Sequence, residues 1–298
     1  GKLQKFVMLG VTGPNEYENN VDNNWYTNFI SNWCMQYTLE AVDWLKANKP
    51  ERYEELKSAN HFNESEETSR WKSIIDNMYY PYDEERGVYL QQDNFLNKEI
   101  IPAADLPESQ RPINQHWSWD RILRSCFIKQ ADVLQGFYFF QEQFSEEAHR
   151  KHFDFYEPIT VHESSLSPCI HVILATKLNK IEKAYEMYLR TARLDLDDYN
   201  SEVHQGLHIT SMAGTWMSIV EGFGGFKVVD NKIHLNPVVP KEWEGFSFKI
   251  RFRKNVVNVE VQRETTVVHN KSGDSIDLVF HGETHTVAKN ESVELKHA

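Results

Sequence analysis

A glutamate in a loop that contains glycine and proline is the first residue whose type and setting suggest chemistry. Glu16 closely follows Gly13 and Pro14, and the polar run 22–24 then precedes a helical pattern. The Gly-Pro pair restricts the backbone and would hold the carboxyl group in one orientation. A carboxylic acid held in this way can protonate a poor leaving group, such as a glycosidic oxygen, as its bond breaks. The alternative is that Glu16 is a solvated loop acid and that Asp22 only caps the helix.

A lysine and a glutamine at the start of a later helical pattern form a second candidate group. Residues 128–132 read Ile-Lys-Gln-Ala-Asp. Lys129, Gln130 and Asp132 therefore offer several hydrogen-bond donors and acceptors at one place. The alternative is an ordinary polar helix start.

Two further segments carry residues that could bind an anion. Ser164 and Ser165 lie just before a predicted helix, in the polar stretch 155–168. The N–H groups of a helix start, together with hydroxyl donors, can hold an anion. Gly206 and His208 stand in a run of small residues, where backbone can approach a ligand and the imidazole can donate to it. The alternatives are simple capping of the helix by serine and a structural histidine.

The spacing of apolar residues predicts that the region 24–223, which carries most of these candidates, is mainly helical. The first helix shows apolar side chains every three to four residues, at Trp25, Phe29, Trp33, Tyr37, Ala41 and Leu45. Further helices are expected at 51–60, 66–79, 120–143, 146–153, 164–178, 181–192 and 211–222. The proline-containing stretch 80–118 is expected to be a long irregular excursion, and 154–168 a polar loop. Residues 2–9 read as a strand.

The hydrophobic period changes to two after Gly224 and Gly225. Alternating apolar positions and turn residues follow, for example at Phe246, Phe248 and Ile250. We therefore expect two domains, a helical one at 1–224 and an antiparallel β domain at 225–298.

Composition narrows the functional classes. The 298 residues carry a net charge of −12, which disfavours nucleic acid and anionic membrane as partners. No apolar run is long enough for a membrane span, and no signal peptide is visible. The three cysteines are widely spaced and odd in number, so we expect no disulfide framework and a reducing cytoplasm. Because they include no C-x-x-C pair, we also expect no metal site. Because the chain lacks an initiator methionine and opens on a strand pattern, we expect it to be a piece of a longer protein.

The joint order of the candidate segments resembles glycoside hydrolase family 65, collinearly along the whole chain. The segments that carry this resemblance are 13–28, 129–132, 156–168 and 206–216. Four further segments resemble the maltose phosphorylase type in particular, namely residues 91–93, 110–115, 117–123 and 193–200.

This resemblance implies a fold and a set of roles. The chain would comprise part of an (α/α)6 catalytic barrel, followed by a small C-terminal β-sheet domain. Glu16 aligns with the general acid of the family. The positions expected to bind phosphate are Ser164, Ser165, Gly206 and His208, and those expected to bind the glucosyl unit are Lys129, Gln130 and Glu157. We expect burial against aromatic residues and a bound phosphate to raise the pKa of Glu16 and keep it protonated near neutral pH.

The implied activity is inverting phosphorolysis of maltose, which yields β-glucose 1-phosphate and glucose. Phosphate is then a substrate and no cofactor is expected. Phosphorolysis or hydrolysis of another α-glucoside (trehalose, kojibiose or nigerose) is the enzymatic alternative, and a sugar-binding module or inactive fragment is the non-enzymatic one. The implied partners are a disaccharide and phosphate, with a homodimer or an association with an N-terminal portion outside this sequence.

Overall fold

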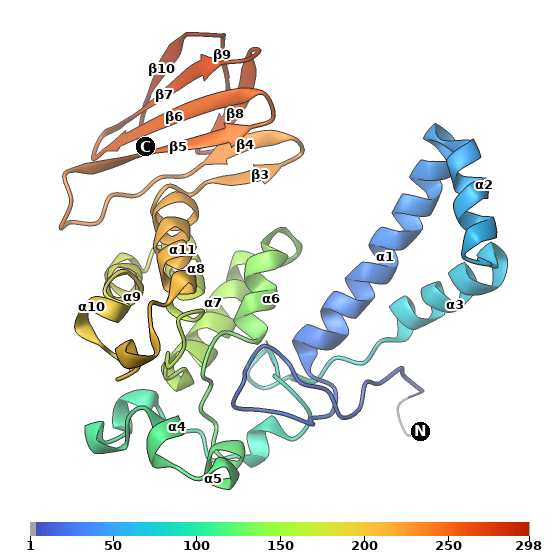
Figure 1. Ribbon diagram of the computed structural model, residues 1–298, viewed down its shortest axis with the longest axis vertical. Helices are drawn as coiled ribbons and strands as arrows, with labels where there is room; N and C mark the ends of the chain where they lie inside the picture. Colours follow the sequence, from blue (N-terminus) through green and yellow to red (C-terminus); the bar gives the residue numbers. More distant parts are fainter. Residues whose placement is uncertain (1–3, 298) are drawn as a thin grey trace. The chain divides into compact units, whose positions relative to one another are not determined.

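The computed structural model describes residues 4–297 of the chain, and Figure 1 labels its helices and strands. The chain forms two compact units, Gly1–Val161 and His162–Ala298. Within residues 4–297 no helix is both long enough and apolar enough to cross a membrane.

The first unit consists of α-helices and short 3-10 turns, with one two-stranded hairpin. Its elements are α1 (Trp25–Asn48), α2 (Pro50–Ala59), α3 (Glu64–Asn77), β1 (Tyr82–Asp83), β2 (Val88–Tyr89), η1 (Phe95–Asn97), η2 (Ala103–Asp105), η3 (Glu108–Gln110), α4 (Ile113–His116), α5 (Trp119–Arg124), α6 (Val133–Phe139), η4 (Gln141–Gln143), α7 (Glu146–Tyr156) and η5 (Glu157–Ile159). The stretch 80–118 has little regular structure, as the sequence predicts.

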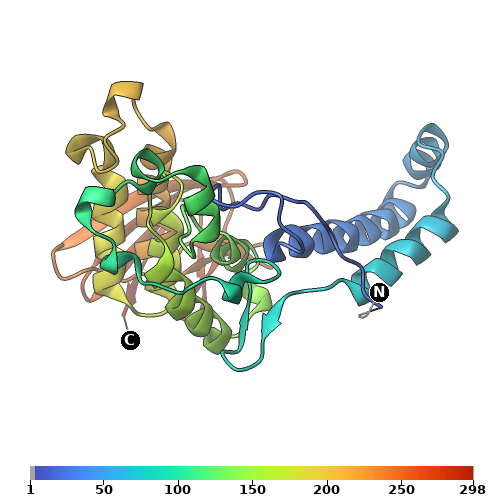
Figure 2. The same cartoon turned by 90° about the horizontal axis from the view of Figure 1, so that it is seen from below.

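Helix α1 begins at the predicted place because Asn24 caps it. The Asn24 side chain accepts a hydrogen bond of 2.9 Å from the backbone N–H of Thr27, a group that the first turn of a helix leaves unpaired. Trp25 is fully buried and stacks on Phe29 and Tyr89. Helix α3 packs against α1, and Figure 2 shows the two side by side. The start of α1, next to the Glu16 loop, is therefore firmly packed.

The single helix predicted at 120–143 is wrong. The structure has α5 and α6 there, separated by a non-helical segment at 125–132. In that segment Ile128 forms a parallel bridge with Thr160: its N–H donates to Ile159, and its carbonyl accepts from Val161. This backbone pairing between distant residues overrides the local helical pattern. Residues 129 and 130 consequently lie in a bend directly after this bridge rather than on a helix.

The expected strand at 2–9 is also absent from the residues that the structure describes there. Residues 4–9 form an isolated bridge, from Phe6 to Met78, instead of a strand, and residues 2 and 3 lie outside the described residues.

The second unit consists of helices followed by two sheets. Its elements are α8 (Pro168–Lys177), α9 (Ile181–Ala192), α10 (Leu194–Asp197), η6 (Val203–Gln205), α11 (Ile209–Met217), the π-helix η7 (Ser218–Phe223), β3 (Lys227–Val229), β4 (Lys232–Leu235), β5 (Gly245–Phe252), β6 (Asn255–Gln262), β7 (Thr265–Ser272), β8 (Ile276–Phe280), β9 (Glu283–Val287) and β10 (Ser292–Lys296).

The strands form two four-stranded sheets, in the orders β10-β7-β6-β5 and β3-β4-β8-β9. All neighbouring strands are antiparallel except β4 and β8, which pair in parallel. This exception follows from topology, since the chain passes through β5, β6 and β7 of the other sheet before it returns as β8.

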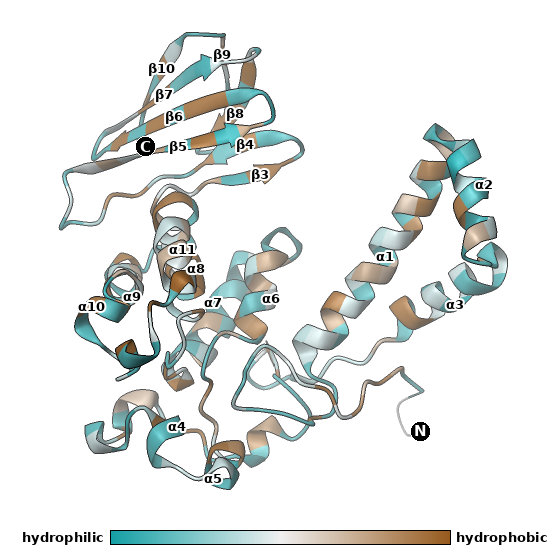
Figure 3. Cartoon of the chain, viewed as in Figure 1, coloured by the Kyte–Doolittle hydropathy of each residue, from teal (hydrophilic) through white to brown (hydrophobic). Residues whose placement is uncertain are grey.

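Both sheets contribute to one hydrophobic core, and the predicted alternation accounts for it. In β5, Phe248 and Ile250 are buried while Ser247 and Lys249 are exposed. Figure 3 shows the hydrophobic positions of β5 and β6 in brown. The predicted fold class, helices followed by a small β domain, is confirmed. The (α/α)6 arrangement and the domain boundary between 224 and 225 stay predictions.

Candidate active site

The loop that carries Glu16 is closed by backbone pairing. Val11 and Val21 exchange two hydrogen bonds of 2.9 Å, so residues 12–20 form a loop whose ends are fixed just before α1. A catalytic side chain on such a loop is positioned by the rigid elements beside it.

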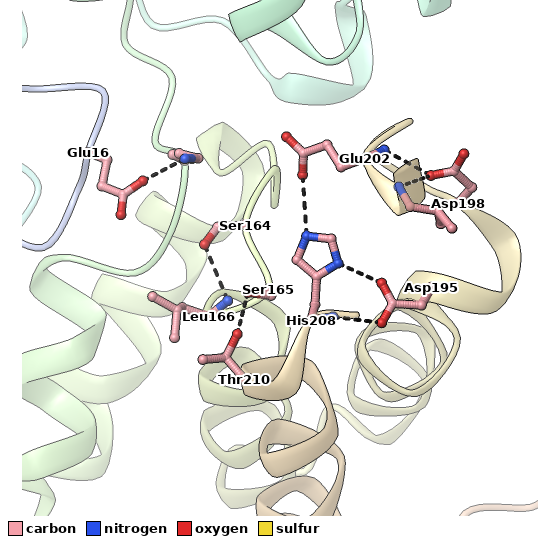
Figure 4. A network of polar contacts seen from close by, with 11 residues as sticks. Glu16, Ser164, Ser165, Leu166, Asp195, Asp198, Glu202, His208 and Thr210 are labelled. Atoms are coloured by element: carbon pink, nitrogen blue, oxygen red, sulfur yellow. Dashed lines mark hydrogen bonds and ion pairs between the residues drawn. The ribbon is translucent and has the colours of Figure 1, made fainter. Parts of the chain in front are cut away.

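Glu16 forms an ion pair with Lys129, which is 113 residues farther along the chain. The Lys129 ammonium donates to the Glu16 carboxylate at 2.5 Å, along the dashed line drawn at Glu16 in Figure 4. Gln130 also hydrogen-bonds to Glu16. The structure thus brings together three of the predicted site residues of this unit.

Gln130 has unused hydrogen-bonding capacity. Its side chain is 5% exposed, and its Oε1 atom has no hydrogen-bond partner within the described part of the chain. A buried amide oxygen without a partner is unfavourable, and a ligand hydroxyl group can satisfy it.

Lys129 lowers the pKa of Glu16 rather than raising it. The hydrogen bond from Lys129 is the main cause that holds the pKa of the Glu16 carboxyl below its ordinary value. Partial burial acts in the opposite direction, while the charge of Lys129 and the hydrogen bond from Gln130 lower the pKa further. The expectation that burial keeps Glu16 protonated is wrong for this arrangement, because its side chain is 56% exposed and faces an ammonium group.

Glu157 stands where α7 ends and η5 begins, and it is partly buried. Its carbonyl oxygen accepts a hydrogen bond of 3.1 Å from Thr160, the residue that bridges to Ile128. The same backbone junction therefore positions both Glu157 and the segment that carries Lys129.

Ser164 and Ser165 lie in the loop before α8. Ser164 is buried, and its Oγ accepts a hydrogen bond of 3.2 Å from the backbone N–H of Leu166. The Ser165 hydroxyl lies 2.5 Å from the hydroxyl of Thr210, in the first turn of α11 (Figure 4). This contact joins the serine loop to the helix that follows His208.

The alternative that a serine side chain caps α8 is wrong. Ser167 occupies the cap position, but its side chain makes no capping hydrogen bond. Its Oγ instead lies 2.8 Å from Nδ1 of His162.

His208 lies at the start of α11 and is held there by the carboxylate of Asp195. Asp195 accepts hydrogen bonds from the His208 backbone N–H, at 2.9 Å, and from its Nδ1, at 2.6 Å. The hydrogen bond from His208 is the main cause that lowers the pKa of Asp195. On the other side of the ring, Nε2 lies 3.8 Å from Glu202 (Figure 4). With Nδ1 donating, Nε2 donates only in the imidazolium form.

Gly206 lies two residues before His208 in open space. Its φ is 119°, a conformation that strongly favours glycine. Apart from Gly206 and its two chain neighbours, no described residue has an atom within 4 Å of the position that a β-carbon would take. Its backbone is therefore accessible to a ligand.

Sequence reasoning missed three residues that organise these two groups, namely Asn15, Asp195 and Thr210, and it named Asp132 without its structural role. Each lies within or beside a segment that the sequence singles out, yet only its hydrogen bonds in the folded chain assign it a structural role. Within residues 4–297 the structure contains no group of three or more His, Cys, Asp or Glu residues that could hold a metal ion.

Family models match almost the whole chain. Residues 1–217 match the glycosyl hydrolase family 65 central catalytic domain, and residues 226–287 match the family 65 C-terminal domain. The chain belongs to glycosyl hydrolase family 65. The resemblance inferred from the motifs is thereby confirmed.

The similar members of family 65 include several phosphorylases. Maltose phosphorylase of Bacillus subtilis is 47% identical, over 93% of this chain and 36% of that protein. The α,α-trehalose phosphorylase of Thermoanaerobacter brockii is 41% identical, over 94% of this chain and 36% of that protein. Kojibiose phosphorylase of Halothermothrix orenii is 33% identical, over 89% of this chain and 34% of that protein.

A solved structure of the family supports the fold. It is named as a candidate kojibiose phosphorylase from the human microbiome, and it is 33% identical with a TM-score of 0.89, over 98% of this chain and 40% of that one. The chain therefore spans little more than a third of the length of the curated family members that it matches.

Proposed function

We propose that this chain forms part of an inverting disaccharide phosphorylase, which converts maltose and phosphate into β-glucose 1-phosphate and glucose. The observation that carries the proposal is the fixed loop that pairs Glu16 with Lys129 and with buried Gln130. The greater identity to a maltose phosphorylase than to the trehalose and kojibiose enzymes supports maltose as the substrate.

In this proposal Glu16 is the general acid. The Glu16 carboxyl group gives its proton to the glycosidic oxygen as the C1–O bond breaks, and glucose leaves with that proton. A phosphate oxygen attacks C1 from the opposite face, which inverts the anomeric centre. Because phosphate is already an anionic nucleophile, the reaction needs no second carboxylate as a base.

The ion pair must rearrange for Glu16 to act as an acid. Lys129 and Gln130 bind hydroxyl groups of the glucosyl unit in this proposal, and Glu157 does the same from the end of α7. A hydroxyl group that accepts from the Lys129 ammonium competes with Glu16 for it. Sugar binding thus weakens the main interaction that lowers the Glu16 pKa and allows the carboxyl group to hold a proton.

The phosphate site is proposed at the start of α11 and the loop before α8. Ser164 and Ser165 supply hydroxyl groups, Gly206 supplies accessible backbone, and His208 supplies Nε2. Asp195 orients the imidazole through Nδ1, and in the imidazolium form both ring nitrogens donate.

Hydrolysis of the disaccharide is the second candidate reaction. The observation that favours it is the pair of carboxylates beside His208, since Glu202 lies 3.8 Å from Nε2 and a carboxylate can activate water. Phosphorolysis is preferred because the similar members of the family are named as phosphorylases. Trehalose and kojibiose are the alternative substrates, because similar members of the family are named as trehalose and kojibiose phosphorylases.

The wider setting of the enzyme is proposed from the sequence. Residues 1–224 would contribute to an (α/α)6 catalytic barrel, and residues 225–298 would form a supporting C-terminal domain. We propose a cytoplasmic homodimer that needs no cofactor and no metal ion.

The substitution Glu16→Gln tests the proposed function. In the full-length protein we expect it to lower kcat for phosphorolysis of maltose by about 10²- to 10⁴-fold, the usual contribution of general acid catalysis. Glucose release measures the rate, and circular dichroism checks the fold. The matched control is Glu40→Gln, which changes an exposed acid on α1 and should leave kcat unchanged. Turnover of Glu16→Gln within tenfold of the unsubstituted protein would refute the acid assignment.

A further inference from the structure

A buried carboxylate lies behind the loop that carries Glu16. Asp132 is 2% exposed and accepts hydrogen bonds from two asparagines of the N-terminal segment. The backbone N–H of Asn15 donates to Oδ2 at 3.1 Å. The side-chain amide of Asn24 donates to Oδ1 at 3.0 Å and to Oδ2 at 3.2 Å. Asp132 therefore fastens the residue directly before Glu16 to the cap of α1.

Asn15 extends this connection to both sides of the ion pair. Its side chain is almost completely buried, and its Oδ1 accepts from the backbone N–H of Tyr17 at 3.2 Å and of Lys129 at 3.0 Å. Its Nδ2 donates to Gln91 at 3.3 Å. The backbone on each side of Glu16 is thus anchored, and the backbone of Lys129 is anchored to the same oxygen atom.

The donors to Asp132 are amides and carry no charge that would compensate a buried carboxylate. Burial is the largest influence on this group and raises its pKa to about 7, although the hydrogen bonds from Asn15 and Asn24 act in the opposite direction. Burial is the main cause that raises the pKa values of the Tyr26 and Tyr156 hydroxyl groups, and the charge of Asp132 raises them further. An isolated buried carboxylate is unfavourable for folding, which points to a role beyond packing.

The carboxylate leaves no room for a larger residue in the Gly-Pro turn of the loop. A β-carbon at Gly13 would overlap the side-chain amide of Asn24 and would lie 2.5 Å from Oδ2 of Asp132. The glycine before Pro14 is therefore explained by close approach to this hydrogen-bonded group. Asp132 therefore lies against the loop at Gly13 and at Asn15.

We propose that Asp132, acting through Asn15, is a positioning residue that holds the Glu16 carboxyl group and Lys129 in register for proton donation. This inference rests on the proposed function, in which Glu16 protonates the leaving group. In this role Asp132 does not contact the reacting atoms. A shift of about 1 Å in a catalytic group can lower a rate by about 100-fold, so the register of Glu16 controls its effectiveness.

Two substrates with different leaving groups test this role. The disaccharide maltose needs a proton on its leaving oxygen, whereas α-glucosyl fluoride loses fluoride with much less help from an acid. In the full-length protein we expect Asp132→Asn to lower kcat for maltose phosphorolysis about 10- to 100-fold. At saturating α-glucosyl fluoride, the same variant should keep fluoride release within about threefold of the unsubstituted protein, because loss of fluoride depends little on proton donation by Glu16. A displaced Lys129 would instead raise KM for both substrates. Asn15→Ala should show the same selectivity and serves if Asp132→Asn does not fold.

The matched control is Asn270→Ala in the β domain. Asn270 is a fully buried amide whose Nδ2 donates to the carbonyl groups of Asp274 and Val287, so its loss removes a comparable hydrogen-bonded group. This variant should change the two substrates by equal factors. Equal losses on both substrates in Asp132→Asn or Asn15→Ala, or no loss on maltose, would overturn the positioning role. Glu16→Gln is measured in parallel: equal losses on both substrates there would refute the acid assignment itself, which is a separate failure.

Discussion

At the scale of single residues, the ion pair between Glu16 and Lys129 governs how the proposed acid can work. Lys129 holds the pKa of Glu16 down, while the proposed reaction needs Glu16 protonated. The identity of both residues as site candidates follows from their motifs in the sequence. The direction in which the pKa of Glu16 is shifted could not be predicted from the sequence. It depends on a contact between residues 113 positions apart and on the exposure of the Glu16 carboxyl group.

Removing the charge of Lys129 should change the pH dependence of the reaction. A general acid loses activity as the pH rises through its pKa, and Lys129→Met removes the main interaction that lowers the pKa of Glu16. We expect the alkaline limb of the kcat/KM profile to move to higher pH, while kcat/KM at its maximum falls because the proposed contact of Lys129 with the sugar is lost. The kcat/KM profile of maltose phosphorolysis from about pH 3 to 9 measures both effects, because the pKa of Glu16 lies below its ordinary value of 4.5. An alkaline limb that stays in place or moves to lower pH would show that Glu16 does not set it.

At the scale of elements, long-range backbone pairing explains why the sequence misplaced part of the helical pattern. The strongly periodic segments that became α1 and α9 could be predicted from spacing alone. The segment 125–132 could not, since its bridge between Ile128 and Thr160 joins distant parts of the chain. The hydrogen bonds of Asn15 and Asp132 escaped prediction for the same reason.

A buried histidine joins α7 to the β1–β2 hairpin. Nε2 of His152 accepts a hydrogen bond of 2.8 Å from the backbone N–H of Tyr89, and its Nδ1 donates to Ala148 at 2.7 Å. This arrangement requires the neutral ring, and burial lowers the pKa of His152 to about 4. The unfolded chain, with an ordinary histidine pKa near 6.5, then binds more protons than the folded one between about pH 4 and 6.5.

The contact of His152 should therefore weaken in acid. Stability from the neutral ring is fully present above about pH 6.5 and is lost as the pH falls toward 4, by about 3 kcal/mol in total. His152→Asn cannot titrate, so the difference in unfolding free energy between the unsubstituted protein and this variant should shrink from pH 7 to pH 4.5. Urea unfolding at the two pH values measures this difference, and His171, whose pKa also lies at about 4, is unchanged in both proteins. A difference that does not depend on pH would contradict the assignment.

At the scale of the whole molecule, the family and the succession of a helical region and a β domain could both be predicted from the sequence. The change of hydrophobic period after Gly225 was sufficient to predict the β domain, because the alternation in strands such as β5 corresponds directly to burial. The parallel pairing of β4 and β8 was not predictable from that alternation, which carries no information on strand order. The choice of substrate also lies outside what periodicity can show, since it depends on contacts with the acceptor sugar.

The dependence of disaccharide cleavage on phosphate tests the proposed activity most directly. The full-length protein is incubated with maltose, trehalose or kojibiose, with and without inorganic phosphate, and the products are followed by proton NMR from the first minutes. We predict cleavage of maltose only when phosphate is present, with equal amounts of glucose and β-glucose 1-phosphate. Cleavage of maltose to glucose alone, at the same rate without phosphate, would contradict the account.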